Sequence, residues 1–229
     1  PTPRSDAHAA QRHAEINALP AREDIALVFL GDSISERWES DGRYAWNRHY
    51  EPRRAANFGV AGDRSEHVLW RIEHGNFAGL QPRLVVLLIG TNNLLVHDDA
   101  EVAAGVVAVV DRLRAKLPGT RILLLGILPR GARPDDPMRA RIRAINASLA
   151  ALQDGAGLHF FDAGPALLEA DGRLDREIAP DFLHLSPRGY RLLAKVPRLP
   201  GPIVERLVEH FGGLQRLLAA SVDDLQTVE

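Results

Sequence analysis

Short apolar runs recur along this 229-residue chain, and they constrain its fold more than any other feature. Ile25–Leu30, Leu84–Ile89 and Arg121–Gly126 are nearly continuous aliphatic stretches, each about one strand long. Runs of this kind predict strands that are buried on both faces, as in a parallel sheet. Weaker runs predict two further strands, one ending at 57–59 and one over 158–161.

Helical patterns lie between these runs, with apolar residues spaced three and four apart. The alternation of strands and helices implies right-handed βαβ crossovers. We therefore expect a three-layer α/β/α sandwich, flavodoxin-like in architecture, with a mostly parallel sheet of about five strands. The expected helices cover 5–18, 64–73, 99–116 and 137–153, and a last one begins at Pro187.

Composition removes several classes of function. The net charge of −2 gives no general attraction to nucleic acids or anionic membranes. No apolar run approaches the roughly 20 residues of a membrane-spanning helix. The absence of cysteine excludes thiolate metal sites and a cysteine nucleophile, and the histidines show no spacing typical of a metal site. A leader cleaved earlier would be invisible, so the sequence leaves open the cytoplasm or export.

Ser33 is the first candidate for chemistry. It follows the first apolar run in Gly31-Asp32-Ser33, which places it at a turn from strand to helix, where ligand sites of such sheets lie. A serine hydroxyl becomes a useful nucleophile only with a base in hydrogen-bond reach and donors for the developing oxyanion. The same three residues are also typical of a helix N-cap.

His184 is the candidate base, because Asp181 precedes it by three residues in a loop flanked by prolines. In this arrangement the carboxylate can hold Nδ1 while Nε2 faces the serine. The alternative is an ordinary surface loop in which Asp181 caps the backbone. Both interpretations remain open from these residues alone.

Gly62 and Asn92 are candidate oxyanion donors, since they follow the second and third apolar runs. A glycine leaves its N–H unobstructed, and an asparagine amide brings two N–H groups. A plain turn glycine and an Asx-turn are the structural alternatives. Asp32 and Asp63 flank Ser33 and Gly62, and we expect them either to hydrogen-bond the site loops or to serve ordinary turns.

The order of these blocks resembles the SGNH hydrolases, the GDSL esterase/lipase superfamily, over roughly residues 13–196. Gly-Asp-Ser, a glycine, Gly-x-Asn and Asp-x-x-His occur in the order of that family. The segments 57–72, 84–93 and 121–131 look closest to the branch of the platelet-activating-factor acetylhydrolase catalytic subunits. One departure is Ile34, where many members have leucine.

The resemblance implies a serine esterase with Ser33 as nucleophile and His184 and Asp181 completing a triad. It implies oxyanion donors on the Ser33 and Gly62 backbone and the Asn92 side chain. It further implies a fold that works without metal or cofactor, a small-molecule ester as substrate, and short acyl groups, acetyl above all. A carbohydrate O-deacetylase is the alternative, and only the resemblance points to a homodimer.

Two further segments carry weaker expectations. Leu183 and the turn 128–131 are candidates for walls of an acyl pocket. Residues 195–229 contain several prolines and short helical patterns, and they resemble a truncated helix-hairpin-helix region of the DNA-integrity scanning diadenylate cyclases.

We therefore expect a hydrolase domain over 1–197 and a helical appendage over 198–229, and no nucleic acid as partner. A DNA-binding protein with a non-catalytic hydrolase scaffold, or a non-catalytic subunit that binds a partner, are the alternatives from other classes.

Overall fold

A computed structural model describes residues 1–19 and 24–195. Its centre is one sheet in which all neighbouring strands are parallel, in the order β2-β1-β3-β4-β5. The buried side chains of β1, β3 and β4 are all hydrophobic, as expected of strands covered on both faces, whereas β2 also buries Asn57. The strands are β1 (Leu27–Gly31), β2 (Ala55–Gly59), β3 (Leu84–Leu88), β4 (Arg121–Leu125) and β5 (Leu158–Phe161).

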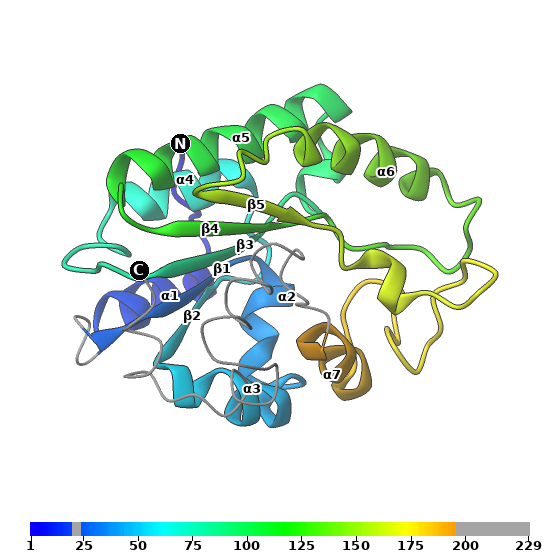
Figure 1. Ribbon diagram of the computed structural model, residues 1–229, viewed down its shortest axis with the longest axis horizontal. Coiled ribbons are helices and arrows are strands. Elements are labelled where there is room, and N and C mark those ends of the chain that lie inside the picture. Colours follow the sequence, from blue (N-terminus) through cyan, green and yellow to red (C-terminus); the bar gives the residue numbers. More distant parts are fainter. Residues whose placement is uncertain (20–23, 196–229) are drawn as a thin grey trace.

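Helices cover both faces of this sheet, with α4, α5 and α6 on one side and α2, α3 and α7 on the other (Figure 1). The predicted α/β/α sandwich is therefore confirmed. Buried side chains of α1 join the same core as those of α4, α5 and α6. The helices are α1 (Ala7–Asn17), α2 (Ser33–Glu36), α3 (Arg43–His49), α4 (Ser65–Glu73), α5 (Asp99–Lys116), α6 (Pro137–Ala150) and α7 (Pro187–Lys195). Short 3-10 turns complete the described elements: η2 (Arg37–Glu39), η3 (Glu51–Arg53), η4 (Asn93–Leu95) and η5 (Gly164–Leu167).

Successive strand residues belong to different cores, as the period of a strand requires. Val28 and Leu30 of β1 pack in one core, whereas Phe29 between them packs in the other. Around Phe29 the second core is aromatic, with Trp38 at 5.8 Å between ring centroids and Trp46 at 5.1 Å. These tryptophans therefore pack against the sheet.

Glycines let α2 approach the ends of β1 and β2 closely. A Cβ on Gly31 would lie 2.3 Å from the Ser35 Oγ, and one on Gly59 would lie 2.1 Å from the Glu36 nitrogen. Asn57 fastens the same contact, because its amide donates to the Ser35 carbonyl at 2.9 Å. The short helix that begins at the candidate nucleophile is thereby fixed against the sheet edge.

The predicted elements agree with the structure to within a few residues. The helix expected over 137–153 ends at Ala150, and the one expected over 5–18 begins after Asp6, whose side chain caps it. Sequence patterns missed α3, since seven residues are too few to show two helical turns of periodicity. The tail predicted for 198–229 lies outside the described residues.

Candidate active site

Three parallel strands bring the candidate residues to one edge of the sheet. Ser33 follows β1 by two residues, Gly62 follows β2 by three and Asn92 follows β3 by four. These strands are neighbours in the sheet, so their carboxyl ends lie side by side. The loops that leave them therefore meet over the middle of the sheet, where α/β folds carry their sites.

Ser33, His184 and Asp181 form one chain of hydrogen bonds. The Ser33 Oγ lies 2.9 Å from the His184 Nε2, and the His184 Nδ1 lies 2.7 Å from the Asp181 Oδ2. If Nδ1 carries the proton that Asp181 accepts, Nε2 is left to accept the serine proton. The Ser33 residue is 9% exposed, and the His184 side chain is 20% exposed. The base is thus reachable from solvent while the nucleophile is mostly covered.

Asp181 binds the backbone of its own loop as well as the imidazole. Its Oδ1 accepts from the N–H groups of Leu183 at 3.0 Å and His184 at 2.7 Å. Partial burial on its own would raise the pKa of Asp181, but the bonds from His184 and from the two N–H groups lower it to about 2. Phe182, between Asp181 and Leu183 in the chain, has a φ of +58°, so the loop turns sharply at this point. The Asp181 carboxylate is therefore charged at neutral pH and holds the imidazole.

Asn92 and its neighbour Asn93 serve different purposes. The Asn92 Nδ2 donates to the Asp63 carbonyl at 2.8 Å, which uses one of its two N–H groups. Asn93 is buried, and its side chain accepts from the Ser65 N–H at 3.0 Å and donates to the Ser65 Oγ at 3.1 Å. The second N–H of Asn92 thus leaves a donor for the site, whereas Asn93 holds the start of α4.

Gly62 lies in the left-handed region, with a φ of +83°, which a residue with a side chain rarely adopts. On its far side lies Arg4 from the segment before α1. A Cβ on Gly62 would lie 2.6 Å from the Arg4 Nη1, and the same guanidinium donates to the Ala61 carbonyl and pairs with Asp6 at 2.7 Å. Arg4 therefore supports the Gly62 turn from outside.

Asp63 and Arg71 form a buried ion pair beneath the same turn. The Arg71 Nε lies 2.8 Å from the Asp63 Oδ2, and the two side chains are 4% and 1% exposed. Arg71 also donates to Asn76 at 2.6 Å and to the Gly31 carbonyl at 3.4 Å. Burial raises the pKa of the Asp63 carboxyl, and the contact with Arg71 opposes that rise. One guanidinium thus connects the Gly62 loop to the strand that leads into Ser33.

Asp32 caps α2 directly in front of Ser33. Its Oδ1 accepts from the Ile34 N–H at 3.0 Å. The Oδ2 is buried and has no hydrogen-bond partner in the described part of the chain. The side chain therefore does serve as the N-cap that the sequence allowed, but half of its hydrogen-bonding capacity is unused.

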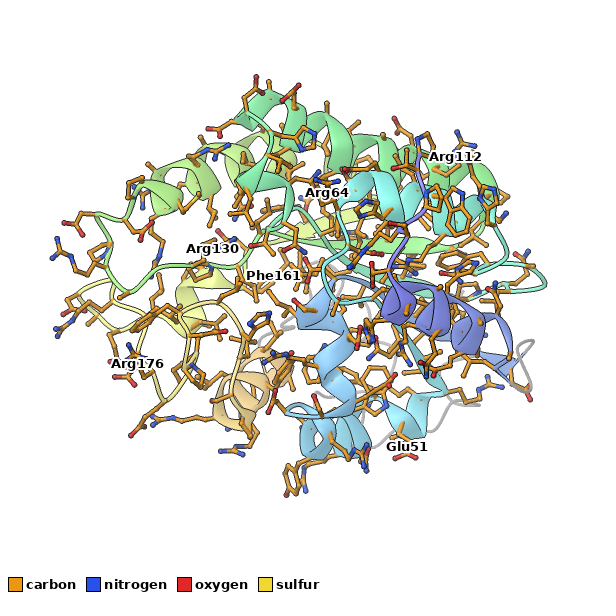
Figure 2. All side chains as sticks on the ribbon, turned by 180° about the vertical axis from the view of Figure 1, so that it is seen from behind. Glu51, Arg64, Arg112, Arg130, Phe161 and Arg176 are labelled. Carbon is orange, nitrogen blue, oxygen red and sulfur yellow. The ribbon has the colours of Figure 1, made fainter. Side chains whose placement is uncertain are left out.

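The turn 128–131 closes another side of the site. Arg130 donates to the Thr91 carbonyl at 3.1 Å, next to Asn92. The buried Arg139 holds the turn in place, since it donates to the carbonyls of Arg130 at 2.9 Å and Gly131 at 3.0 Å. In Figure 2, Arg130 lies on the same side of the molecule as Arg176, which belongs to the segment before His184. Arg130 and Arg139 thus hold the turn 128–131 in place.

Sequence reasoning brought forward Ser33, Gly62, Asn92, Asp181 and His184, and the structure places them all around this edge. It overlooked Arg71 and Arg4, which hold the loops. A signal for Arg71 existed, because it lies three residues after Val68 on the apolar side of the helix predicted over 64–73. No such signal marked Arg4, whose partners in the Gly62 turn, Ala61 and Asp63, are more than 50 residues away. Among the described residues no group of three or more His, Asp or Glu side chains is arranged to hold a metal ion.

Comparisons with known proteins agree with this arrangement of elements. Residues 29–192 match the model of the GDSL-like Lipase/Acylhydrolase family. The Homo sapiens platelet-activating factor acetylhydrolase IB subunit alpha1 is 35% identical over 195 residues, which cover 83% of this chain and 83% of that protein.

Two solved structures show the same fold. A GDSL-like lipase from Bacteroides thetaiotaomicron VPI-5482 superposes with a TM-score of 0.66 at 19% identity, covering 87% of this chain and 96% of that one. A variant of an acetyl-xylooligosaccharide esterase from Geobacillus Stearmophilus superposes with a TM-score of 0.61 at 19% identity, covering 78% and 94%.

Proposed function

Because the chain belongs to the GDSL-like lipase/acylhydrolase family and is therefore a hydrolase, we propose that it cleaves esters of short acyl groups, acetyl above all, with Ser33 as nucleophile. The observation that carries this proposal is the continuous chain of hydrogen bonds from Asp181 through His184 to Ser33. It ends at the strand edge that also holds Gly62 and Asn92. Hydrolysis by an activated serine needs these parts together.

Acylation is the first of two steps. The Ser33 Oγ forms a bond to the ester carbonyl carbon, the π electrons move to the carbonyl oxygen, and the serine proton passes to the His184 Nε2. The tetrahedral intermediate then collapses, the bond to the alcohol oxygen breaks, and His184 gives its proton to that oxygen. The products of this step are a free alcohol and an acylated Ser33.

Deacylation repeats the sequence with water. His184 takes a proton from a water molecule as its oxygen bonds to the acyl carbon. The second tetrahedral intermediate releases the carboxylic acid, and the proton returns from His184 to the Ser33 Oγ. Asp181 stays ionised throughout, which its low pKa of about 2 supports, and it stabilises the imidazolium that exists twice in each cycle.

The negative oxygen of both intermediates rests on the N–H groups of Ser33 and Gly62 and on the amide of Asn92. Each such donor contributes on the order of 3 kcal/mol to the transition state. The bond from Asn92 to the Asp63 carbonyl supports this role, because it fixes the amide before substrate arrives. An amide that is already held in this orientation needs no reorganisation during the reaction.

Several features support a small acyl group. Ile34, which follows Ser33, and Leu128 are 1% and 3% exposed in the second core, and the half-buried Leu183, which precedes His184, packs against that core. The names of two similar proteins, an acetylhydrolase subunit and an acetyl-xylooligosaccharide esterase, both specify acetyl. They differ in the alcohol, so a carbohydrate O-deacetylase is the second candidate, favoured by the second of these likenesses.

The test is hydrolysis of p-nitrophenyl acetate, butyrate and octanoate, beside an acetylated xylo-oligosaccharide. We expect kcat/KM to fall with acyl length in wild type and activity to vanish in Ser33→Ala. Ser148→Ala, on the exposed surface of α6, is the matched control and should behave as wild type. Faster release of acetate from the oligosaccharide than from the aryl ester would favour the second candidate. Folded protein without activity on any ester would contradict the proposal.

The same preparation tests the alternatives from other classes. DNA affinity that falls steeply with salt would favour a DNA-binding protein, whose expected site at 198–229 lies outside the described residues. Full esterase activity without such affinity would exclude a non-catalytic scaffold. A homodimer, to which only the family likeness points, is tested by the mass of the particle in solution.

A further inference from the structure

Asp32 is a buried carboxyl directly beside the nucleophile, and the proposed reaction does not use it. The residue is 1% exposed, and the Ile34 N–H at 3.0 Å is the donor to its Oδ1. The Oδ2 has no partner among residues 1–19 and 24–195. A buried carboxylate ordinarily gathers several donors or a cation, because an uncompensated charge in the interior is costly.

The groups around Asp32 do not supply that compensation. The Asp63 carboxyl is near enough to repel a charge on Asp32, and the Arg71 guanidinium is engaged with Asp63. Arg130, from the turn after β4, stabilises a negative charge on Asp32, but this effect is smaller than the destabilisation of that charge by burial and by Asp63. From α7, the neutral Tyr190 hydroxyl donates to the Ile34 carbonyl at 2.6 Å.

The remaining titratable group beside Ser33 is His184, whose Nε2 lies 2.9 Å from the serine hydroxyl. Burial is the main cause that raises the pKa of Asp32, and the nearby Asp63 carboxyl raises it further. The hydrogen bond from the Ile34 N–H lowers it, and the pKa that results is about 7.

A charge on Asp32 would also oppose the reaction. The proposed oxyanion rests partly on the Ser33 N–H, which belongs to the peptide group between Asp32 and Ser33. A carboxylate one residue away in a low-dielectric interior repels the negative oxygen as it develops. A neutral acid keeps Oδ1 as acceptor for the Ile34 N–H, so it preserves the cap without that repulsion.

We infer that Asp32 is a positioning residue that works as a neutral carboxylic acid, and that its loss of a proton to solvent slows acyl transfer. The inference rests on the proposed serine mechanism and deepens it. It gives the site two ionisations with opposite effects: His184 must be without its extra proton to accept one from Ser33, whereas Asp32 must keep its proton. Activity should therefore pass through a maximum and then fall on the alkaline side, with a midpoint near pH 7.

The test is the pH profile of kcat/KM for p-nitrophenyl acetate in wild type and Asp32→Asn. The amide keeps an oxygen for the Ile34 N–H and cannot ionise. We expect Asp32→Asn to retain the fall on the acid side, to lose the fall on the alkaline side, and to come within about threefold of wild type at the wild-type maximum. Asp98→Asn alters a cap of the same kind on the exposed end of α5 and should leave the wild-type profile.

Two outcomes would overturn the inference: an alkaline fall that persists in folded Asp32→Asn, or equal loss of activity at all pH values. A second measurement does not depend on activity. The infrared difference spectrum between wild type and Asp32→Asn should show the C=O stretch of a protonated carboxyl at pH 5.5 that disappears by pH 9. Absence of that band at pH 5.5 would refute a neutral Asp32. If folded wild type hydrolyses no ester, the proposed function fails, and this titration alone decides the state of Asp32.

Discussion

The two sides of Ser33 are built by different means. On the side of Gly62 and Asn92, the loops are held by buried polar groups, foremost the Asp63–Arg71 pair at 4% exposure or less. On the side of His184, the loop is held by backbone hydrogen bonds and by Asp181, whose side chain is 55% exposed. The donors for a transition-state charge thus belong to the core, whereas the base belongs to the surface. Loss of a core group should damage folding as well as rate, and loss of a surface group should damage rate alone.

The base side gives the largest expected effect. His184→Ala should lower kcat by roughly 10⁴-fold or more, because within residues 1–19 and 24–195 no other side chain is recorded in hydrogen-bond contact with the Ser33 hydroxyl. Thermal unfolding should stay close to wild type, since the imidazole is partly exposed and its loop keeps its backbone bonds. Unfolding of this variant at a much lower temperature than wild type would contradict the claim that the His184 side of the site contributes to rate alone.

Removal of Arg71 tests the buried side. Arg71→Met leaves the buried Asp63 carboxylate with only its longer contact of 3.7 Å to Arg4, and removal of the main partner of a buried charge costs about 3–5 kcal/mol of unfolding free energy. Denaturant titration measures it. Arg188→Met removes the partner of Glu177 in an exposed pair and should cost less than about 1 kcal/mol. Equal losses of unfolding free energy in the two variants would show that the buried Asp63–Arg71 pair stabilises the fold no more than the exposed pair does.

The two carboxyls beside the site should give opposite dependences of stability on pH. Asp32 has a folded pKa of about 7, above the ordinary 3.8, so the folded state binds its proton more tightly and unfolding free energy falls as pH rises from about 4 to 7. The whole change is on the order of 4 kcal/mol. Asp181 has a folded pKa of about 2, so its contribution is present above pH 4 and is lost below it.

Chemical denaturation between pH 4 and 8 measures this difference. Asp32→Asn should remove the part of the decline that wild type shows between pH 4 and 7, whereas Asp181→Asn should leave that decline in place. Curves of wild type and Asp32→Asn that run parallel over this range would contradict a raised pKa for Asp32.

Two adjacent asparagines provide a finer comparison. Asn92→Ala should lower kcat about a hundredfold with little change in KM, because one oxyanion donor is lost. Asn93→Ala should instead lower the unfolding temperature, since its amide holds the buried Ser65 backbone. Steady-state kinetics and a thermal melt on both variants decide the matter. A large KM change with intact kcat in Asn92→Ala would refute its role as donor.

The smallest expected effect concerns Arg4, which supports the Gly62 turn from a partly exposed position. Arg4→Gln should lower kcat a few fold, with KM unchanged, because the turn loses a brace and keeps its buried one. Arg114→Gln, in an exposed pair with Asp154, is the matched control and should not alter kcat. Identical kinetics for the two variants would place Arg4 outside the site.

The sequence was sufficient for the fold because β1, β3 and β4 are buried on both faces and therefore appear as nearly continuous apolar runs. It was also sufficient to nominate Ser33, His184 and Asp181, since each lies at a strand end or in a short motif. It was not sufficient for Arg71 or Arg4, which act through contacts between segments far apart in the chain. Nor did it reveal the state of Asp32, because burial and unpaired oxygens are properties of packing.

The central claim is that Ser33 carries the acyl group between the two steps. Its most direct test is mass spectrometry of the protein quenched in acid during turnover of p-nitrophenyl acetate, followed by peptide mapping. The account predicts one added acetyl group, located on Ser33, in wild type and none in Ser33→Ala. Acetylation of a different residue during turnover, or turnover by Ser33→Ala at the wild-type rate, would contradict it.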